Sequence, residues 1–299
     1  MSRPTSARSR WLLAARPRTL PAALAPVALG SALAARLHHF QPVPAALCAA
    51  FALLAQIGAN FANDYFDFRR GADAPGRLGP TRAVAAGLIA PGAMLRATFL
   101  VLALAAVAGC GLLPYGGWIL IVLGVASLLT ALAYTGGPFP LAYHGLGEIC
   151  ALVFFGFVAV LGTYFVQTGG PLTLEAWLTA TACGLLAANI LLVNNVRDLA
   201  TDARAGKRTL VVRFGRAFAH RLYSCNIVFA LLTPVLLFLG GMKPFVLVAL
   251  AELPLGVLLV RFLAATPDGD GPRFNKLLAQ SAQYLALWAG FLAVGISLG

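Results

Sequence analysis

Long stretches without a charged residue alternate with short polar segments along the 299 residues of this chain. A helix needs about 20 apolar residues to cross the hydrocarbon core of a membrane, and six stretches are long enough. They are 37–63, 97–147, 149–174, 176–196, 222–242 and 277–299. The second is long enough for two helices, and the turn-forming run Leu113–Gly117 divides it. The pattern predicts an all-α, polytopic membrane protein.

Proline, glycine and charged residues then place about nine transmembrane helices. Their expected ranges are about 19–37, 43–64, 92–113, 117–135, 145–167, 173–197, 218–240, 244–263 and 276–298. The first eight fall into two four-helix halves, about 15–140 and 141–265, and the ninth helix follows at about 276–298. An even number of helices per half gives both halves the same orientation, which is typical of a parallel internal repeat. We therefore expect one membrane domain over residues 1–299.

Composition and charge agree with this interpretation. The chain is 60% hydrophobic and only 11% charged, which excludes an ordinary soluble domain. Its net charge of +12 lies in the loops, so it indicates membrane orientation and no nucleic-acid partner. With the N-terminus in the cytoplasm, 20 of the 22 basic residues fall on the cytoplasmic side, and only Arg36 and Lys243 fall outside. We expect a multi-pass protein of the bacterial cytoplasmic (inner) membrane, and no obligate protein partner is evident.

Polar residues gather at the inner ends of the second and sixth predicted helices. Five of the ten acidic residues lie there or just beyond: Asp64, Asp67, Asp73, Asp198 and Asp202. In each site an asparagine precedes the first aspartate by four residues. Since positions three and four apart share a helix face, each site forms a polar stripe. One stripe contains Asn60, Asn63, Asp64 and Asp67, and the other contains Asn194, Asn195, Asp198 and Asp202.

Carboxylates on one helix face repel one another unless a cation neutralises them. Mg²⁺ prefers hard oxygen ligands and binds one or two carboxylates together with the oxygens of a substrate phosphate. Basic residues follow both stripes, including Arg77 and Arg82 after the first and Lys207 and Arg208 after the second. This combination predicts a magnesium-diphosphate site at the membrane boundary.

The two stripes resemble the NDxxD and DxxxD signatures of the UbiA superfamily of prenyltransferases. The surrounding sequence is most similar to the menaquinone branch of that superfamily. The matching segments are Ala15–Pro21, Asn63–Asp73, Gly79–Arg82, Ala133–Pro138, Gly145–Glu148 and Asn195–Thr209. One departure is Gly71, where many members carry a third aspartate. Asp73 follows two residues later.

The resemblance implies transfer of a polyprenyl group from polyprenyl diphosphate to 1,4-dihydroxy-2-naphthoate, with loss of CO₂. It implies Mg²⁺ as the cofactor, held by Asp64, Asp67, Asp198 and Asp202, with Lys207 completing the catalytic set. The expected substrate-binding residues are Asn60, Asn63, Arg77, Arg82, Asn194, Asn195, Arg208, Arg18 and Tyr134. Membrane lipid would surround the long isoprenoid tail.

Several residues have two interpretations. Arg18 either contacts the acceptor carboxylate or anchors the first helix, and Tyr134 and Tyr143 either line an acceptor pocket or lie at the membrane interface. Glu148 is expected to pair with an arginine. Glu252 interrupts the eighth predicted helix, and no motif of the family includes it.

Two alternative functions stay open at this stage. The chain could prenylate another aromatic acceptor, such as 4-hydroxybenzoate, or it could be an ion-coupled transporter, since transporters also combine repeats with membrane carboxylates. The position of the aspartates at helix ends, beside basic loops, favours the enzyme. Isoprenoid length and oligomeric state do not follow from the sequence.

Overall fold

The computed structural model describes residues 6–72 and 78–299, and these residues form helices and connecting loops without a β-strand. In the first part of the chain they are α1 (Ala7–Ala15), η1 (Pro17–Thr19), α2 (Pro21–Arg36), α3 (Pro42–Arg69), α4 (Pro91–Cys110), α5 (Leu113–Gly116), α6 (Ile119–Ala133) and η2 (Leu141–His144). The second part contains α7 (Gly147–Ala151), η3 (Leu152–Leu161), α8 (Gly162–Thr168), α9 (Leu174–Arg197), α10 (Leu199–Arg204), α11 (Leu210–Leu239), η4 (Pro244–Glu252), α12 (Leu253–Ala265) and α13 (Gly271–Ser297). The predicted all-α class is confirmed.

Seven helical segments in the described part of the chain are long and apolar enough to cross a membrane. They are Pro42–Arg69, Pro91–Cys110, Gly147–Thr168, Leu174–Arg197, Leu210–Leu239, Pro244–Ala265 and Gly271–Ser297. Two shorter apolar helices, α2 and α6, coincide with the first and fourth predicted spans. The chain is therefore a multi-pass membrane protein, while the count of nine spans stays a prediction.

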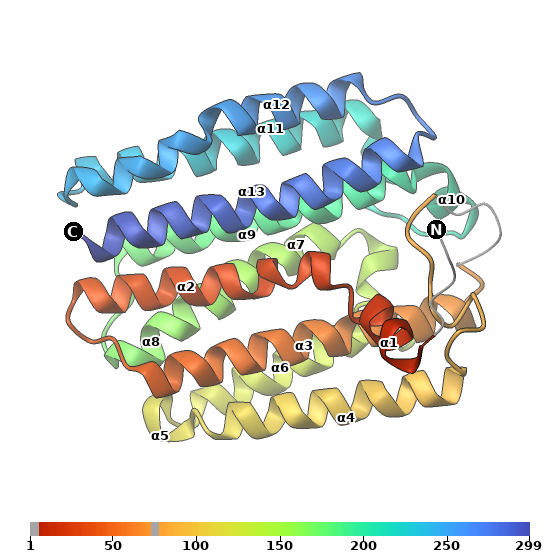
Figure 1. The fold of residues 1–299 in the computed structure, drawn as a ribbon, viewed down its shortest axis with the longest axis horizontal. Helices are drawn as coiled ribbons and strands as arrows, with labels where there is room; N and C mark the ends of the chain where they lie inside the picture. The colour runs from red at the N-terminus through yellow and green to blue at the C-terminus, as the bar shows by residue number, and fades with distance from the viewer. Residues whose placement is uncertain (1–5, 73–77) are drawn as a thin grey trace.

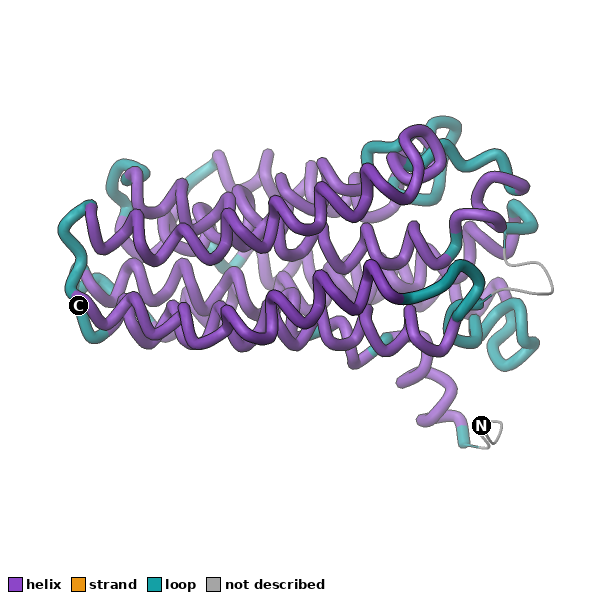
Figure 2. The backbone as a smooth tube through the Cα atoms, turned by 90° about the horizontal axis from the view of Figure 1, so that it is seen from above, coloured by secondary structure: helices purple, strands orange, loops and turns teal. Residues whose placement is uncertain are grey.

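The long helices run side by side along the longest axis of the molecule (Figure 1). The helix ends that carry the two acidic motifs, in α3 and at the junction of α9 with α10, lie at the same end of the bundle as α1, and the C-terminus lies at the other end. Arg36 is the last residue of α2, and Lys243 directly precedes η4. Both of these helix ends lie at the end of the bundle that holds the C-terminus. Seen from above, the N-terminal helix projects from the bundle (Figure 2), and α1 packs against α3. All four predicted metal-binding aspartates thus come to one end.

Large apolar side chains cover the outside of the bundle. No residue of α6 is buried, and α4 exposes Leu100 and Val107 by 63% and 69%. A soluble protein rarely exposes such continuous apolar surface, but lipid solvates it well. These faces agree with a protein surrounded by membrane.

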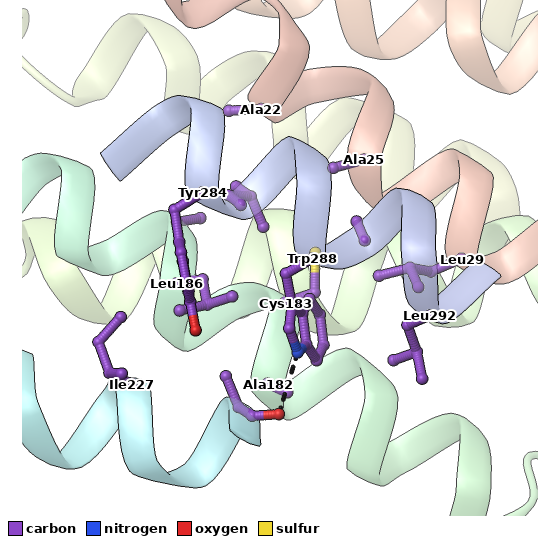
Figure 3. Close-up of a cluster of buried hydrophobic side chains, with 14 of the residues drawn as sticks. Ala22, Ala25, Leu29, Ala182, Cys183, Leu186, Ile227, Tyr284, Trp288 and Leu292 are labelled. Atoms are coloured by element: carbon purple, nitrogen blue, oxygen red, sulfur yellow. Dashed lines mark hydrogen bonds between the residues drawn. The ribbon is translucent and has the colours of Figure 1, made fainter. Parts of the chain in front are cut away.

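The packed interior lies mainly around α13, which contacts α2, α9 and η4. Trp288 and Tyr284 of α13 pack with Cys183 and Leu186 of α9 (Figure 3). The Trp288 indole Nε1 donates to the Ala230 carbonyl oxygen of α11 over 3.0 Å, which satisfies its buried N–H group. The last helix is therefore a central element of the bundle.

Three predicted spans depart from regular α-helix. The fifth consists of α7, the π-helical η3 and α8, and the eighth consists of the 3₁₀ helix η4 followed by α12. The seventh begins at Leu210, earlier than expected, and its backbone breaks at Gly215, where φ is 79°. Only glycine adopts this angle without strain, so the break has a local cause. A π-helix often occurs beside a functional site.

Candidate active site

One cavity of about 660 Å³ connects the two acidic motifs with the apolar interior of the bundle. At one end it is lined by charged and amide side chains from α3, α9, α10 and the loops beside them. The rest of its wall is mostly apolar and includes Val27, Phe51, Leu120, Phe154 and Val166. The predicted residues on the wall are Asn60, Asn63, Asp64, Asp67, Arg82, Tyr134, Asn194, Asn195, Asp198, Asp202 and Lys207. The two motifs therefore share one site.

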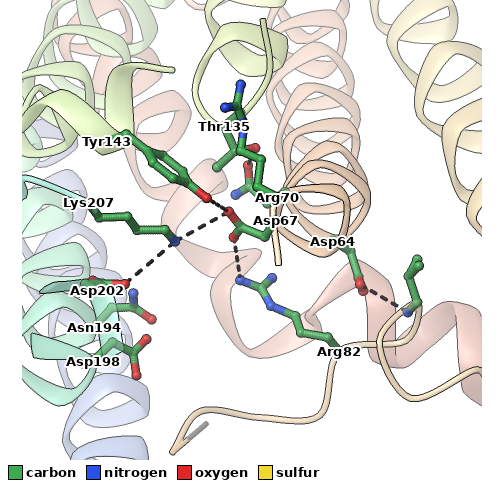
Figure 4. Close-up of polar contacts among 12 residues, drawn as sticks. Asp64, Asp67, Arg70, Arg82, Thr135, Tyr143, Asn194, Asp198, Asp202 and Lys207 are labelled. Atoms are coloured by element: carbon green, nitrogen blue, oxygen red, sulfur yellow. Dashed lines mark hydrogen bonds and ion pairs between the residues drawn. The ribbon is translucent and has the colours of Figure 1, made fainter. Parts of the chain in front are cut away.

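Asp67 is the centre of the polar end. Its Oδ2 lies 3.3 Å from Nη2 of Arg82, and its Oδ1 accepts a hydrogen bond of 3.1 Å from the Tyr143 hydroxyl (Figure 4). The Lys207 Nζ lies 3.4 Å from the same Oδ1 and 3.7 Å from Oδ1 of Asp202. Lys207 thus joins a carboxylate of the first motif to a carboxylate of the second.

Tyr143 adds a neutral hydrogen-bond donor to this group. Burial, together with the charge of Asp67 and the hydrogen bond to it, holds the pKa of the Tyr143 phenol well above its usual value. The phenol therefore keeps its proton and donates to Asp67 throughout the neutral pH range. The Lys207 ammonium also lies 4.8 Å from the centre of the Tyr143 ring, a favourable cation–π position.

Asp198 is paired with its neighbour Arg197. The Arg197 guanidinium binds both carboxylate oxygens, with Nε 2.8 Å from Oδ1 and Nη2 2.6 Å from Oδ2. It also donates to the side-chain oxygens of Asn194 and Asn275, each over 2.7 Å. Arg197 is buried and lines the cavity, which makes it a site residue that the sequence prediction missed. Its position within the second motif, directly before Asp198, was the signal that could have identified it.

Asp64 holds a loop. Its Oδ2 accepts from the backbone N–H of Ala83 over 3.0 Å and its Oδ1 from that of Val84 over 3.1 Å. Ala83 and Val84 are buried against Phe61 of α3 in a small apolar cluster. Since Arg82 directly precedes Ala83, Asp64 also fixes the backbone that presents Arg82 to Asp67. The Asp64 side chain points away from Asp198 and Asp202 (Figure 4).

The amide side chains of the first motif are also held in place. The Asn60 Nδ2 donates to the carbonyl oxygen of Ala15 over 3.0 Å, and the Asn63 Oδ1 accepts from the Thr135 hydroxyl over 2.9 Å. These bonds join α3 to the end of α1 and to the loop after α6. They give the cavity wall a fixed geometry before any substrate binds.

The remaining predicted residues are not all at the cavity. The Arg208 side chain is exposed and does not line it; the Arg208 backbone N–H donates to the Tyr143 carbonyl oxygen over 2.8 Å. Arg77 and Asp73 lie outside the described residues, and so does the side chain of Arg18. Glu148 pairs with Asn195, where an arginine was expected.

The acidic side chains of the site are oxygen donors of the kind that divalent cations prefer. Among residues 6–72 and 78–299, no cluster of three or more His, Cys, Asp or Glu side chains has the geometry of a metal site. The Lys207 ammonium lies between Asp67 and Asp202 and compensates part of their negative charge. Oxygen donors of this kind suit Mg²⁺, which also takes ligands from a bound phosphate. The donor set therefore fits a divalent cation that takes its remaining ligands from a substrate phosphate.

Comparisons with known proteins identify the chain. A model of the UbiA prenyltransferase family matches residues 23–296. The chain belongs to the UbiA prenyltransferase family. It is accordingly an enzyme that transfers prenyl groups, as the sequence motifs predicted.

Curated relatives of this family member are similar over most of its length. A 1,4-dihydroxy-2-naphthoate octaprenyltransferase from Mycobacterium tuberculosis is 39% identical and covers 97% of this chain and 98% of its own. An Escherichia coli protein of the same name is 43% identical, over 72% of this chain and 71% of its own. The human UbiA prenyltransferase domain-containing protein 1 is 32% identical, over 96% of this chain and 83% of its own.

Solved structures agree in fold. The UbiA homologue from Aeropyrum pernix K1 covers 90% of this prenyltransferase with a TM-score of 0.65 at 17% identity, and 97% of that chain is matched. The UbiA homologue from Archaeoglobus fulgidus bound to DMAPP and Mg²⁺ covers 95% with a TM-score of 0.61 at 15% identity, and 99% of that chain is matched. The polytopic helical fold is thus the fold of this family.

Proposed function

We propose that the enzyme transfers a polyprenyl group from polyprenyl diphosphate to 1,4-dihydroxy-2-naphthoate, releasing CO₂ and diphosphate and giving demethylmenaquinone. The observation that carries the proposal is the cavity of about 660 Å³, charged at one end and apolar along the rest. A diphosphate joined to a long hydrocarbon has the same two parts. The names of the similar relatives support the choice of acceptor.

The charged end suits the diphosphate. Arg82 and Lys207 supply positive charge there, and each is paired with Asp67 in the described structure. We propose Mg²⁺ as the cofactor because carboxylates alone would repel the diphosphate; the Archaeoglobus fulgidus homologue bound to DMAPP and Mg²⁺ supports this. When bound, the ion neutralises charge on the leaving diphosphate. Asp67, Asp198 and Asp202 would hold it, and Asp64 remains a predicted ligand that also anchors the loop.

Lys207 and Arg82 have a second task in this proposal. With a cation held by the carboxylates of the site, Arg82 and Lys207 would be available to the diphosphate oxygens. Basic groups fixed at the point where negative charge grows stabilise the transition state more than the ground state. The same side chains therefore neutralise the site before binding and assist departure of the leaving group afterwards.

The reaction balances without an oxidant. The allylic C–O bond of the donor breaks, and its electron pair leaves with the diphosphate. The ring carbon that bears the acceptor carboxylate forms the new C–C bond to the allylic carbon. The C–CO₂⁻ bond then breaks, and its electron pair restores aromaticity as CO₂ departs. The apolar cavity wall keeps water from capturing the allylic cation.

Sidedness follows from the same proposal. We infer that the end of the bundle with the acidic motifs faces the cytoplasm of a bacterial cell and that the N-terminus is cytoplasmic. The basic loops at this end support that orientation through the positive-inside rule. The isoprenoid tail would extend along the cavity toward the membrane interior and leave into lipid.

The experiment that tests the proposal uses membranes that contain the full chain. They are incubated with a polyprenyl diphosphate, Mg²⁺ and either 1,4-dihydroxy-2-naphthoate or 4-hydroxybenzoate, and lipid-soluble products are analysed. The proposal predicts a prenylated product from the naphthoate and much less from the benzoate. A preference for 4-hydroxybenzoate would assign another branch of the family. No prenylation of any aromatic acceptor would overturn the proposed reaction.

A further inference from the structure

Glu148 is a buried acidic residue beside the cavity, and its partner is a neutral side-chain amide. Asp67, Asp198 and Asp202 each have a basic partner, but Glu148 is joined to a neutral amide. Its side chain is buried, with 5% of the residue exposed, and its Oε1 accepts from Nδ2 of Asn195 over 2.9 Å. Its Oε2 has no hydrogen-bond partner among the described residues. Glu148 therefore contacts the cavity wall through Asn195.

The bond to Glu148 sets the direction of the Asn195 amide. A carboxylate can only accept hydrogen bonds, so the amide must turn its NH₂ group toward Glu148. The Asn195 Oδ1 then faces away from Glu148. Asn195 lines the cavity, whereas Glu148 lies behind it and does not. With its NH₂ group bound to Glu148, Asn195 keeps its Oδ1 as the hydrogen-bond acceptor that it can offer to the cavity.

The surroundings of Asn195 suit an aromatic ring. The Tyr134 hydroxyl lies against Gly147, the residue before Glu148, because a Cβ at Gly147 would come within 3.0 Å of that hydroxyl. The same Cβ would come within 2.8 Å of Leu191 Cδ2. Tyr134 and Leu191 both line the cavity. A hydrogen-bond acceptor, a phenol and an apolar side chain thus meet on one part of the wall.

We propose that Glu148 is a positioning residue that fixes the Asn195 amide so that its Oδ1 selects a hydroxyl group on the aromatic acceptor. This inference rests on the proposed function and adds to it the group on the acceptor that is recognised. A hydroxyl donates to the Asn195 oxygen, whereas a methyl ether or a quinone carbonyl cannot. As the ring carbon attacks, positive charge grows on the hydroxyl group. Its hydrogen bond therefore strengthens in the transition state and favours the reaction.

The test measures the prenylation of an aromatic acceptor and of its methyl ether. It uses the parent enzyme and three variants: Glu148→Gln, the double variant Glu148→Gln with Asn195→Asp, and Glu252→Gln. In the parent enzyme we expect kcat/KM to fall by about tenfold to a hundredfold for the ether that blocks the recognised hydroxyl, because a buried acceptor is left unpaired. In Glu148→Gln the new amide presents either its oxygen or its NH₂ group to Asn195. The Asn195 amide is then free to turn over, and the preference for the hydroxyl should largely disappear while the KM for the prenyl diphosphate stays within about twofold.

The exchange variant separates orientation from fold. In Glu148→Gln combined with Asn195→Asp, the glutamine NH₂ donates to the new carboxylate, whose other oxygen again faces the cavity as an acceptor. We expect this double variant to regain the preference that Glu148→Gln loses. Glu252→Gln is the matched control, because Glu252 is also a buried glutamate in a membrane helix but does not line the cavity. It should keep the parent preference.

Each outcome decides the proposal. Unchanged discrimination in Glu148→Gln would overturn it. If Glu148→Gln lost prenyl transfer from the diphosphate and the double variant did not regain it, the proposal would also be overturned. Glu148 would then support the fold. The same loss of discrimination in Glu252→Gln would overturn the proposal as well, because the effect would then be one of any buried charge. Failure of the proposed function is distinguishable, because the hydroxyl preference is measured with whichever aromatic acceptor the parent prenylates.

Discussion

The ammonium of Lys207 lies 3.4 Å from a carboxylate oxygen of Asp67, although the two residues come from opposite halves of the chain. The same ammonium lies 3.7 Å from Asp202. Both carboxylates are buried, so each would be costly without a partner of opposite charge. One basic side chain therefore holds the two acidic motifs together at the charged end of the cavity.

Replacing Lys207 by glutamine should remove this link and the positive charge for the diphosphate. We expect kcat/KM for the prenyl diphosphate to fall by about a hundredfold or more, as happens when one group that stabilises transition-state charge is removed. Steady-state kinetics on membranes that contain the variant provide the measurement. The matched control is Lys276→Gln, since Lys276 is exposed and has no contact with the acidic motifs. Equal activity in the two variants would exclude a role for Lys207.

Asp64 should have a structural effect that a metal ligand alone would not have. Asparagine retains one oxygen, so Asp64→Asn loses one of the two bonds to the Ala83 and Val84 amides. We expect loss of turnover together with faster cleavage by trypsin after Arg82, since the loop opens more often. Asp268→Asn, at an exposed site, is the control. Lost turnover with an unchanged cleavage rate would restrict Asp64 to cation binding.

Removal of divalent cations tests the proposed cofactor. A chelator in excess should abolish turnover, and added Mg²⁺ should restore it, because the carboxylates need the ion to accept a diphosphate. Asp198→Asn should abolish turnover while the protein stays folded in the membrane, and added Mg²⁺ should not rescue it. Full activity in excess chelator would contradict the assignment of Mg²⁺ to this site.

The orientation can be tested with introduced cysteines. Cys110 and Cys225 are exposed in the described structure, so they are first replaced by serine. A cysteine at Arg204 should then be shielded from an impermeant thiol reagent applied from outside intact cells. A cysteine at Lys243 should react, because the two positions lie at opposite ends of the bundle. The reverse labelling pattern would place the N-terminus outside the cytoplasm.

Helical spacing explains why much of the site could be predicted. Asp64 and Asp67 share a face of α3, and the repeated asparagine-to-aspartate spacing located the second motif on α9 and the short α10. Such local patterns fix which side chains line the cavity. The lengths of the uncharged stretches, another local feature, predicted the membrane helices.

Contacts between segments that are distant in the sequence could not be predicted from helical spacing. The two bonds from Asp64 depend on a loop that returns to α3, and the choice of Asn195 as the partner of Glu148 depends on how α7 packs on α9. By sequence Arg197 is one of many basic residues near the second motif, but in the fold it is buried and donates to Asn275 of α13. Spacing along one helix does not encode these approaches between distant segments.

The fate of the acceptor carboxylate tests the central claim most directly. Membranes with the full chain are incubated with polyprenyl diphosphate, Mg²⁺ and 1,4-dihydroxy-2-naphthoate that carries an isotopic label in its carboxyl group. The account predicts one labelled CO₂ for each prenyl group transferred and a prenylated product without label. A prenylated product that keeps the label, with no labelled CO₂ released, would contradict it.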